Sequence, residues 1–182
     1  MAVGKSSLAG RFNQGRFNDV YQNTIGGAYF QKVMSVPDPQ AEPGQPARMQ
    51  QVKLHIWDTG GQEQFRSMMS LYYRDADAAL ICFDISAAKS FDSVSYWIGE
   101  MEKNCNNERK NFVLALAGNK CDIEDSKKQI PMSVADETAK ENDMCYHETS
   151  AKTGEGVNEL FMELISNIII CKRKRQKEQL GF

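Results

Sequence analysis

The chain has 182 residues, of which 41% are apolar and 25% charged, the balance of an ordinary globular domain. This composition excludes a collagen-like chain, a wholly disordered chain and a multi-span membrane protein, and the length predicts one domain, with room for a tail. The five cysteines are nowhere closer than 16 positions apart. We therefore expect neither a disulfide framework nor a zinc site of closely spaced thiols, and a reducing compartment fits best.

The net charge of −2 is unevenly distributed along the chain. Residues 172–182 carry five basic side chains and one acid, a net charge of +4, which leaves −6 on residues 1–171 from 17 basic and 23 acidic residues. An acidic body argues against a nucleic-acid partner. The basic run at 172–177 can touch an anionic membrane surface, or it is simply a solvated helix end. We expect neither a signal peptide nor a transmembrane helix, because no uncharged apolar run approaches about 18 residues.

The first half of the chain contains one predicted helix and two predicted strands. Apolar side chains four positions apart predict a helix over 5–14, and residues 28–36 and 49–57 are predicted strands. The second of these strands alternates polar and apolar residues, as expected for a strand with one wet face. Four of the five prolines fall within residues 36–48, which predicts a solvated loop between the strands.

The second half alternates apolar strands with helical patterns. The continuous apolar runs at 78–83 and 112–117 are typical of strands buried on both faces, as in a parallel sheet. Helical spacing follows each run, and apolar residues three and four apart over 157–168 predict a final amphipathic helix. This alternation predicts an α/β fold with a helix-covered sheet.

The first motif that carries chemistry is Gly4-Lys5-Ser6-Ser7, at the start of the first predicted helix. It matches the second half of the phosphate-binding loop G-x-x-x-x-G-K-[ST], whose first glycine would fall two positions before Met1. Gly4 lets backbone amides approach phosphate oxygens, Lys5 can reach the β- and γ-phosphates, and the Ser6 hydroxyl can bind Mg²⁺. The alternative is a Gly-Lys-Ser turn that merely starts a helix.

The second motif, Trp-Asp-Thr-Gly-Gly-Gln-Glu at residues 57–63, directly follows a predicted strand. A carboxylate at the carboxyl end of a strand lies where α/β folds bind ligands, so Asp58 can hold Mg²⁺ through water. Gly60 and Gly61 let the backbone approach a γ-phosphate and move when it leaves, and Gln62 can orient an attacking water. A plain glycine turn between strand and helix is the alternative.

The third motif, Gly-Asn-Lys-Cys-Asp at residues 118–122, ends the second buried strand. The carboxylate of Asp122 can accept two hydrogen bonds from the N1 and N2 edge of guanine. Adenine has no donors in that arrangement, and its binding would leave the acid unpaired. An ordinary Asn-Lys-x-Asp turn is the alternative.

The fourth motif, Glu-Thr-Ser-Ala-Lys at residues 148–152, follows a short predicted strand at 144–147. Its backbone and the side chain of Lys152 can close over a base.

These four motifs, in this order and spacing, resemble those of the Ras superfamily of small GTPases, over nearly the whole chain. Residues 24–30, 57–63 and 71–76 are most similar to the switch and interswitch segments of the Rab family, which directs vesicle traffic, and to its endocytic, early-endosome branch. The resemblance implies a Ras-like P-loop GTPase fold over residues 1–171, α/β with a mostly parallel sheet and helices on both faces, and a basic tail at 172–182. It implies a GTP/GDP-cycling switch that hydrolyses GTP with Mg²⁺ on the cytosolic face of endomembranes.

The resemblance also implies roles for individual positions. Thr24 becomes the switch residue that binds Mg²⁺ and the γ-phosphate, Phe17 the aromatic near the guanine, and Gln62 the catalytic residue that positions water. The expected metal-binding residues are Ser6, Thr24 and Asp58. The expected nucleotide-binding residues are Gly4, Lys5, Ser6, Ser7, Phe17, Thr24, Asp58, Gly61, Asn119, Lys120, Asp122, Ser150, Ala151 and Lys152.

The partners implied by the resemblance are a nucleotide-exchange factor, a GTPase-activating protein and Rab effectors. Tyr29, Trp57 and Tyr72 match the aromatic trio through which Rabs read effectors, with core packing as the alternative. The likeness shows no arginine supplied in cis, so the activating protein would bring it. We expect a monomer.

The chain departs from the family pattern at both ends. The strand that precedes the phosphate loop has no residues here, and in the family's fold it lies between the strands ending at Trp57 and near Asp84. We expect an open edge on each of these two strands and interpret the chain as truncated at its N-terminus. The C-terminus lacks the cysteines that carry prenyl groups.

Two further functions are kept as alternatives. One is a truncated, non-catalytic GTPase-like interaction module. The other is a nucleotide kinase, against which the lack of an arginine-rich lid argues. His55 and His147 have no partner at metal-ligand spacing, and we expect Cys105 and Cys145 to be packed thiols.

Overall fold

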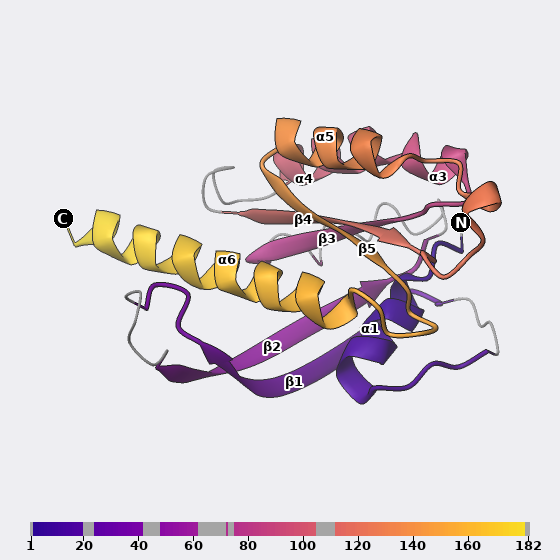
Figure 1. The fold of residues 1–182 in the computed structure, drawn as a ribbon. Helices are drawn as coiled ribbons and strands as arrows, with labels where there is room; N and C mark the ends of the chain where they lie inside the picture. Colours follow the sequence, from indigo (N-terminus) through magenta and orange to yellow (C-terminus); the bar gives the residue numbers. More distant parts are fainter. Residues whose placement is uncertain are drawn as a thin grey trace.

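A computed structural model describes residues 2–19, 24–41, 48–61, 72, 75–104 and 112–180. Gln62, Cys105 and residues 42–47 of the proline-rich loop lie outside the described residues. The elements are α1 (Lys5–Gln14), β1 (Gly27–Pro37), β2 (Met49–Thr59), β3 (Ala78–Asp84), α3 (Ala88–Phe91), α4 (Val94–Asn104), β4 (Val113–Asn119), the 3₁₀ helix η3 (Asp125–Lys127), α5 (Met132–Glu141), β5 (Met144–Thr149) and α6 (Val157–Gln179) (Figure 1).

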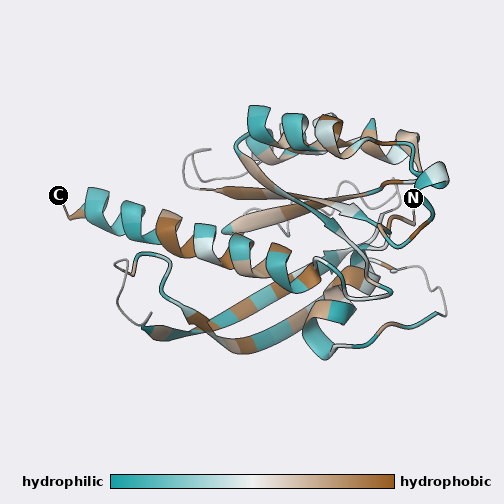
Figure 2. Cartoon of the chain, viewed as in Figure 1, coloured by the Kyte–Doolittle hydropathy of each residue, from teal (hydrophilic) through white to brown (hydrophobic). Residues whose placement is uncertain are grey.

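Strands β1 and β2 form an antiparallel hairpin whose register runs from Gly27 opposite Thr59 to Pro37 opposite Met49. Exposed and half-buried side chains alternate along almost the whole length of both strands, and the hydropathy colours alternate with them (Figure 2). The predicted strands and the wet face are confirmed, and both strands extend slightly beyond the predicted ranges.

Strands β3, β4 and β5 form a separate parallel sheet with β4 in the middle. Six of the seven β4 residues are buried, as predicted for a strand covered on both faces. In β3 the side chains pack against the cores on both faces, as predicted, but Ala78, Ala79, Leu80 and Cys82 are only half-buried. Strand β3 lies at one edge of its sheet, where neighbouring side chains cover it less completely than β4.

Helices cover both faces of the parallel sheet (Figure 1). Helices α3, α4 and α5 pack on one face around a core that includes Phe83, Ile98 and Leu116, and α1 and α6 lie on the other. In α5 the buried face consists of Ala135 and Ala139. Val134, which also belongs to the predicted helical pattern, is 42% exposed, because it lies outside the stripe that faces the sheet.

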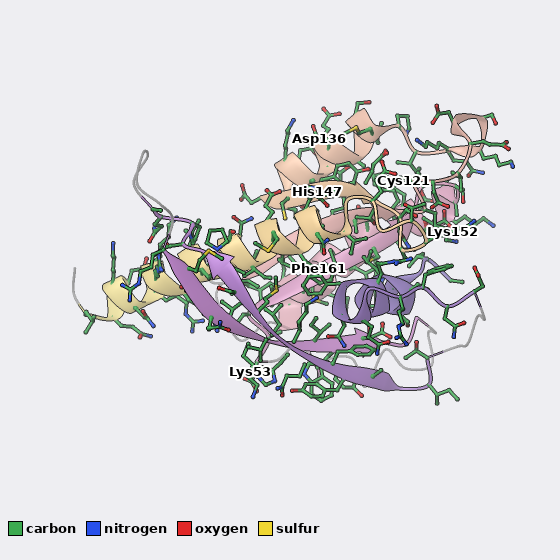
Figure 3. The ribbon with its side chains drawn as sticks, turned by 60° about the horizontal axis from the view of Figure 1, so that its bottom comes forward. Lys53, Cys121, Asp136, His147, Lys152 and Phe161 are labelled. Carbon is green, nitrogen blue, oxygen red and sulfur yellow. The ribbon has the colours of Figure 1, made fainter. Side chains whose placement is uncertain are left out.

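The second core joins the hairpin to the parallel sheet, although the two sheets share no hydrogen-bonded strand pair among the described residues. Val36 of β1, Ala115 of β4 and residues of α1 and α6 belong to this core. The rings of Phe12 and Phe161 stack with centroids 3.8 Å apart, where α6 passes α1 (Figure 3). Side-chain packing therefore connects β2 and β3, although no described strand pairs with both of them.

The carboxyl-terminal part of α6 continues through the basic run and is held to the body by two ion pairs. Lys172 contacts Asp77, just before β3, at 2.7 Å. The Arg173 guanidinium bridges both carboxylate oxygens of Asp38, just after β1, at 2.6 and 3.0 Å. Two of the five basic side chains in the C-terminal segment thus have acidic partners within the fold.

Candidate functional site

The amino-terminal turn of α1 brings Lys5, Ser6 and Ser7 to the edge where the strands end. Gly4 precedes the helix with a φ of +91°, a conformation that favours glycine. A Cβ atom on Gly4 would lie 2.4 Å from the Asn119 side-chain nitrogen, so the close approach of these two segments also requires glycine. The first helical hydrogen bond, from the Leu8 amide to the Gly4 carbonyl, is 2.8 Å long.

Three oxygen-bearing side chains meet beside this turn. The hydroxyls of Ser6 and Thr24 lie 2.7 Å apart, and the Thr24 hydroxyl is 3.5 Å from Oδ2 of Asp58 at the end of β2. Two residues after Asp58, the Gly60 amide donates a 3.0 Å hydrogen bond to the carbonyl of Gly26, which is two residues after Thr24. The structure therefore brings together residues from three segments that are far apart in sequence.

The carboxyl group of Asp58 is buried at 5% exposure. Burial raises its pKa, against the opposing effects of hydrogen bonds from Ser6 and Thr24 and of the Lys5 charge. Its second oxygen, Oδ1, has no hydrogen-bond partner among the described residues. A buried carboxylate oxygen that lacks a donor is costly unless a cation or water satisfies it.

Two hydroxyls and one carboxylate fit Mg²⁺, which binds oxygen ligands and usually takes only one or two protein carboxylates, the rest being water and phosphate oxygens. The described residues hold no cluster of three or more His, Cys, Asp or Glu side chains that would form an all-protein metal cage. The oxygen atoms of Ser6, Thr24 and Asp58 would therefore leave further positions around such a metal for water or phosphate oxygens.

Asn119, at the end of β4, ties three segments together from a fully buried position. Its side-chain nitrogen donates to the Val3 carbonyl at 2.9 Å, and its side-chain oxygen accepts from the Ala151 amide at 3.1 Å and from the Thr149 hydroxyl at 3.4 Å. This side chain thus fixes the turn before α1 against the segment that follows β5.

Asp122 and residues 150–152 lie next to each other on the same edge. The buried Ser150 hydroxyl donates to the exposed Asp122 carboxylate at 2.6 Å and accepts from the Thr153 amide at 3.0 Å. These contacts orient Asp122 while leaving its second carboxylate oxygen available to a ligand. Ala151 is buried and Lys152 is exposed on the loop (Figure 3).

Lys120 forms an ion pair with Asp84, a residue to which none of the four sequence motifs assigns a role. Its ammonium group lies 2.5 Å from the Asp84 carboxylate, and its backbone has a φ of +72°. Burial acts to raise the Asp84 pKa, but hydrogen bonds from Lys120 and Ser86 outweigh it and leave the pKa below its usual value. Asp84 ends β3 as Asn119 ends β4, and that shared position is the signal by which it could have been found.

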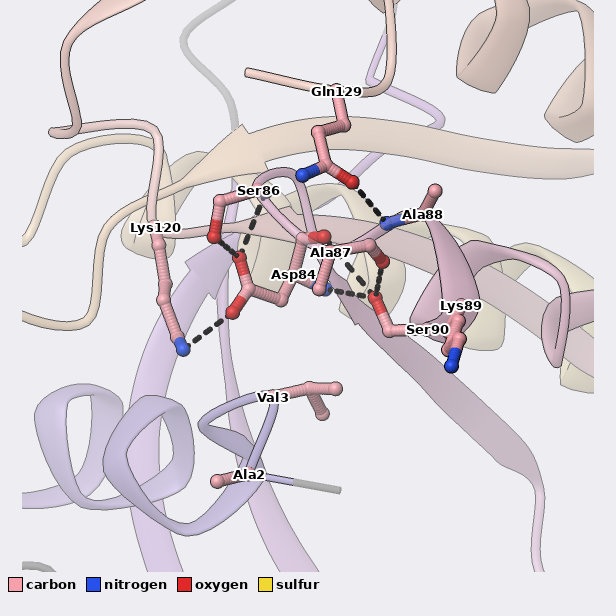
Figure 4. A pocket seen from close by; sticks show the side chains of 10 residues that line it. All are labelled: Ala2, Val3, Asp84, Ser86, Ala87, Ala88, Lys89, Ser90, Lys120 and Gln129. Carbon is pink, nitrogen blue, oxygen red and sulfur yellow. Dashed lines mark hydrogen bonds and ion pairs between the residues drawn. The ribbon is translucent and has the colours of Figure 1, made fainter. Parts of the chain in front are cut away.

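A depression of about 640 Å³ lies beside this ion pair, bounded by Val3, Ser86 and Gln129 as well as Asp84 and Lys120 (Figure 4). Ser6, Thr24, Asp58 and Asp122 are not among its described lining residues. The depression therefore shares Lys120 with the predicted site residues but lies beside the group formed by Ser6, Thr24 and Asp58.

The predicted effector aromatics form an exposed cluster on the outer face of the hairpin. The ring of Trp57 lies 4.9 Å from that of Tyr29 and 5.4 Å from that of Tyr72. Tyr29 and Trp57 are 46% and 52% exposed, so core packing does not account for them. His55 belongs to the same face, and its Nδ1 lies 2.5 Å from the Tyr29 hydroxyl. The sequence could have indicated this neighbour, because His55 is two residues before Trp57 in a strand and therefore lies on the same face.

Other predicted site residues are less closely connected. Ser7 is half-buried in α1, and Phe17 is half-buried against the core that also contains Ala151. Gly61 lies at the end of a described segment, and the predicted catalytic residue Gln62 lies beyond it, outside the described residues. Cys145 is half-buried, and burial raises the pKa of its thiol to about 11.

A parallel sheet with helices on both faces, and a glycine turn that leads into α1 and is tied to the ends of β4 and β5, are consistent with the fold of the P-loop GTPases. The Ras family model matches residues 1–170, and the chain belongs to the Ras family.

Within that family the chain is similar to Rab5 proteins. It is 40% identical to Ras-related protein Rab5 of Nicotiana tabacum over 168 residues, which cover 92% of this chain and 76% of the relative. It is 38% identical to Ras-related protein Rab-5A of Dictyostelium discoideum with the same coverage. It is 36% identical to GTP-binding protein ypt5 of Schizosaccharomyces pombe, covering 92% of this chain and 73% of the relative.

Proposed function

We propose that this chain is a Rab5-like molecular switch that binds GTP and GDP, hydrolyses GTP to GDP and phosphate, and regulates vesicle-mediated transport at endosomal membranes. The observation that carries the proposal is the convergence of Ser6, Thr24 and Asp58 beside the first turn of α1, with Asn119 tying that turn to residues 150–152. In this proposal the first group forms the phosphate end of one nucleotide site and residues 150–152 belong to its base end.

At the phosphate end, Gly4, Lys5 and Ser7 would contact the β- and γ-phosphates. The first turn of α1 contributes unpaired amide groups and the positive end of its dipole. Ser6, Thr24 and Asp58 would hold Mg²⁺, which supplies neutralisation of the charge that develops on the transferred phosphoryl group. Such a cation, or a water molecule bound to it, would satisfy the buried Oδ1 of Asp58, which has no hydrogen-bond partner among the described residues.

At the base end, Asp122 would accept from the two N–H groups of the guanine edge. Ser150 already holds one of its oxygens, so the carboxylate is oriented before the nucleotide binds. Ala151, Lys152 and Lys120 would enclose the base, with Phe17 on the other side. Asn119 would act indirectly, by holding the turn before α1 against the backbone of Ala151.

Hydrolysis would need a water placed in line with the γ-phosphate, a role we assign to Gln62 from its place in the second motif. The switching movement would involve the segments of Thr24 and Gly61, which the γ-phosphate holds and its loss releases. The Gly60–Gly26 hydrogen bond makes the two segments neighbours. An activating protein would supply an arginine, and an exchange factor would release GDP.

The exposed aromatic cluster of Tyr29, Trp57 and Tyr72 would bind effectors. Residues 172–182 would form a tail that assists membrane contact, chiefly through Lys174, Arg175 and Lys177. In the described residues, no helix is both long enough and apolar enough to cross a bilayer. Basic side chains near an anionic surface contribute about 1 kcal/mol each, so this contact would be weak without an anchor.

The proposal is tested by calorimetric titration of the 182-residue chain with GDP, GTP and ATP, with and without Mg²⁺. We expect binding of both guanine nucleotides, strengthened by Mg²⁺, and no comparable binding of ATP. Asp122→Ala should abolish the preference for guanine, while Asp125→Ala, which removes an exposed acid three residues away, should not.

Equal affinity for GTP and ATP would refute the role of Asp122, and no binding of any nucleotide would refute the proposal. A chain that copurifies with GDP, detected by mass spectrometry after denaturation, would exclude the alternative of an interaction module without nucleotide. Single-turnover measurement of phosphate release then tests catalysis, with Gln62→Leu expected to slow it.

A further inference from the structure

Arg11 of α1 makes contacts that span the chain and that the proposed roles leave unexplained. Its Nε donates to the Ala151 carbonyl at 2.8 Å, and one Nη donates to the Lys152 carbonyl at 2.5 Å. The other Nη donates to the Gly15 carbonyl, at the end of its own helix, at 2.8 Å. One guanidinium group therefore links α1 to a loop 140 residues away.

Within the loop at residues 150–154, Arg11 binds the carbonyl groups of Ala151 and Lys152. The Ala151 amide is bound by Asn119, and the Gly154 amide donates to the Ser150 carbonyl at 2.8 Å. The loop is thus held from two other elements, by Asn119 at the Ala151 amide and by Arg11 at the carbonyls of Ala151 and Lys152.

The chemistry of this position suits arginine and no other side chain. Three acceptors are bound by three different nitrogens of one planar group, whereas lysine offers a single atom. The aliphatic part of Arg11 also lies against Gly154, whose φ is +93°. Replacement by lysine would keep the charge and lose the simultaneous bonds.

We propose that Arg11 is a positioning residue that holds residues 150–152 in place and thereby sets the preference of the site for guanine. The link to the base runs through Ser150, whose hydroxyl orients the Asp122 carboxylate. Arg11 also connects the phosphate-binding helix to the base-binding loop, so α1 and the loop move together. The part of this inference that concerns guanine rests on the proposed function, and the part that concerns the loop does not.

The test compares Arg11→Lys and Arg11→Ala with matched changes at the exposed Arg16, on the same 182-residue chain. Amide hydrogen exchange is measured without nucleotide, and the dissociation constants of GDP and IDP are measured by calorimetry. IDP lacks the exocyclic amino group of guanine, so the ratio of the two constants reports on Asp122. Equilibrium unfolding identifies any variant that fails to fold, in which case the milder Arg11→Lys decides.

For both Arg11 variants we expect faster exchange at the amides of Ala151, Thr153 and Gly154, and weaker GDP binding by about tenfold, the loss expected for hydrogen bonds from a charged donor. The preference for GDP over IDP should fall by about threefold, as when one ordinary hydrogen bond is weakened. The Arg16 variants should show none of these changes.

Unchanged exchange in the Arg11 variants would overturn the inference. Faster exchange with an unchanged GDP/IDP ratio, in a chain that binds GDP, would also overturn it and reduce Arg11 to a structural contact. A wild-type chain that binds neither nucleotide would overturn the proposed function and the guanine part of the inference, while the exchange data would still decide whether Arg11 holds the loop.

Discussion

The hairpin and the parallel sheet place their functional side chains in opposite ways. In β1 and β2 every second residue is exposed over most of the strand, and the aromatic cluster stands on that outer face. In β4 six of seven residues are buried, and the polar residue Asn119 comes only where the strand ends. The hairpin therefore displays side chains along its length, whereas the parallel sheet presents them at one edge.

The difference follows from how the two sheets are covered. The hairpin packs its inner face on the α1/α6 core, and its outer face is exposed. The parallel sheet has helices on both faces, and Asp84, Asn119 and Thr149 lie at the carboxyl ends of its strands, the edge where α/β sheets bind ligands.

The largest expected effect compares truncations in the two sheets. Leu116 in β4 is fully buried, and Leu116→Ala should destabilise the chain by about 2–5 kcal/mol through lost burial and a cavity. Val33 on the outer face of β1 is 60% exposed, and Val33→Ala should change stability by no more than about 0.5 kcal/mol. Urea unfolding measures both, and similar losses would contradict the contrast between the sheets.

A second prediction concerns Asp84 at the end of β3. Its lowered pKa means that its ion pair with Lys120 stabilises the fold at neutral pH, and that this stabilisation is lost as the pH falls through the folded-state pKa, below the usual range. Asp84→Asn should lower the melting temperature at pH 7 and flatten its dependence on pH below 5. A variant curve parallel to that of the wild type would argue against the pair.

A third prediction concerns Asp58, at the end of β2, where the dependence of stability on pH has the opposite sign to that at Asp84. Because its pKa is raised, the ionised form is the less favourable one in the fold, and stability falls as the pH rises through the folded-state pKa. In EDTA, Asp58→Asn should therefore raise the melting temperature at pH 7, and with Mg²⁺ and GDP it should lower it. An Asp58→Asn chain that is less stable in EDTA would show that desolvation does not dominate at this carboxyl.

The smallest expected effect follows from removing the ion pair between Arg173 and Asp38. The Arg173 guanidinium lowers the Asp38 pKa through a two-point hydrogen bond, but the pair lies at the surface, where such pairs contribute little. Arg173→Gln should lower the melting temperature slightly in dilute buffer and not at all in 1 M NaCl, where screening removes the attraction. A loss that persists in salt would indicate packing by the arginine stem instead.

Local patterns were sufficient to predict most of the fold and the four motif segments. Alternation identified the hairpin, continuous apolar runs identified β3 and β4, and the bounds of α1 agree with the predicted helix. The half-buried start of β3 was not predictable, because it depends on which strand lies at the edge of the sheet.

The side-chain contacts within the site were beyond local patterns for the same reason. The Arg11 contacts join residues 140 positions apart, and the Asp84–Lys120 pair forms only when two strands lie in register. Nothing in the sequence next to Arg11 distinguishes it from Arg16. Motifs record which residue types are present, while their partners depend on how the chain folds back.

The length of helix α6 determines how a force applied to the carboxyl terminus would be transmitted through the molecule. With 23 residues, and a rise of about 1.5 Å for each, it is a stiff rod about 35 Å long. It begins at Val157, directly after Gly156, where a Cβ atom would lie 2.1 Å from the Glu148 carbonyl oxygen, and near its other end Arg173 forms an ion pair with Asp38. A load applied to the carboxyl terminus therefore reaches the hairpin both through the Arg173–Asp38 ion pair and through the core that α6 shares with the hairpin, and it also travels along the helix to the segment around Glu148.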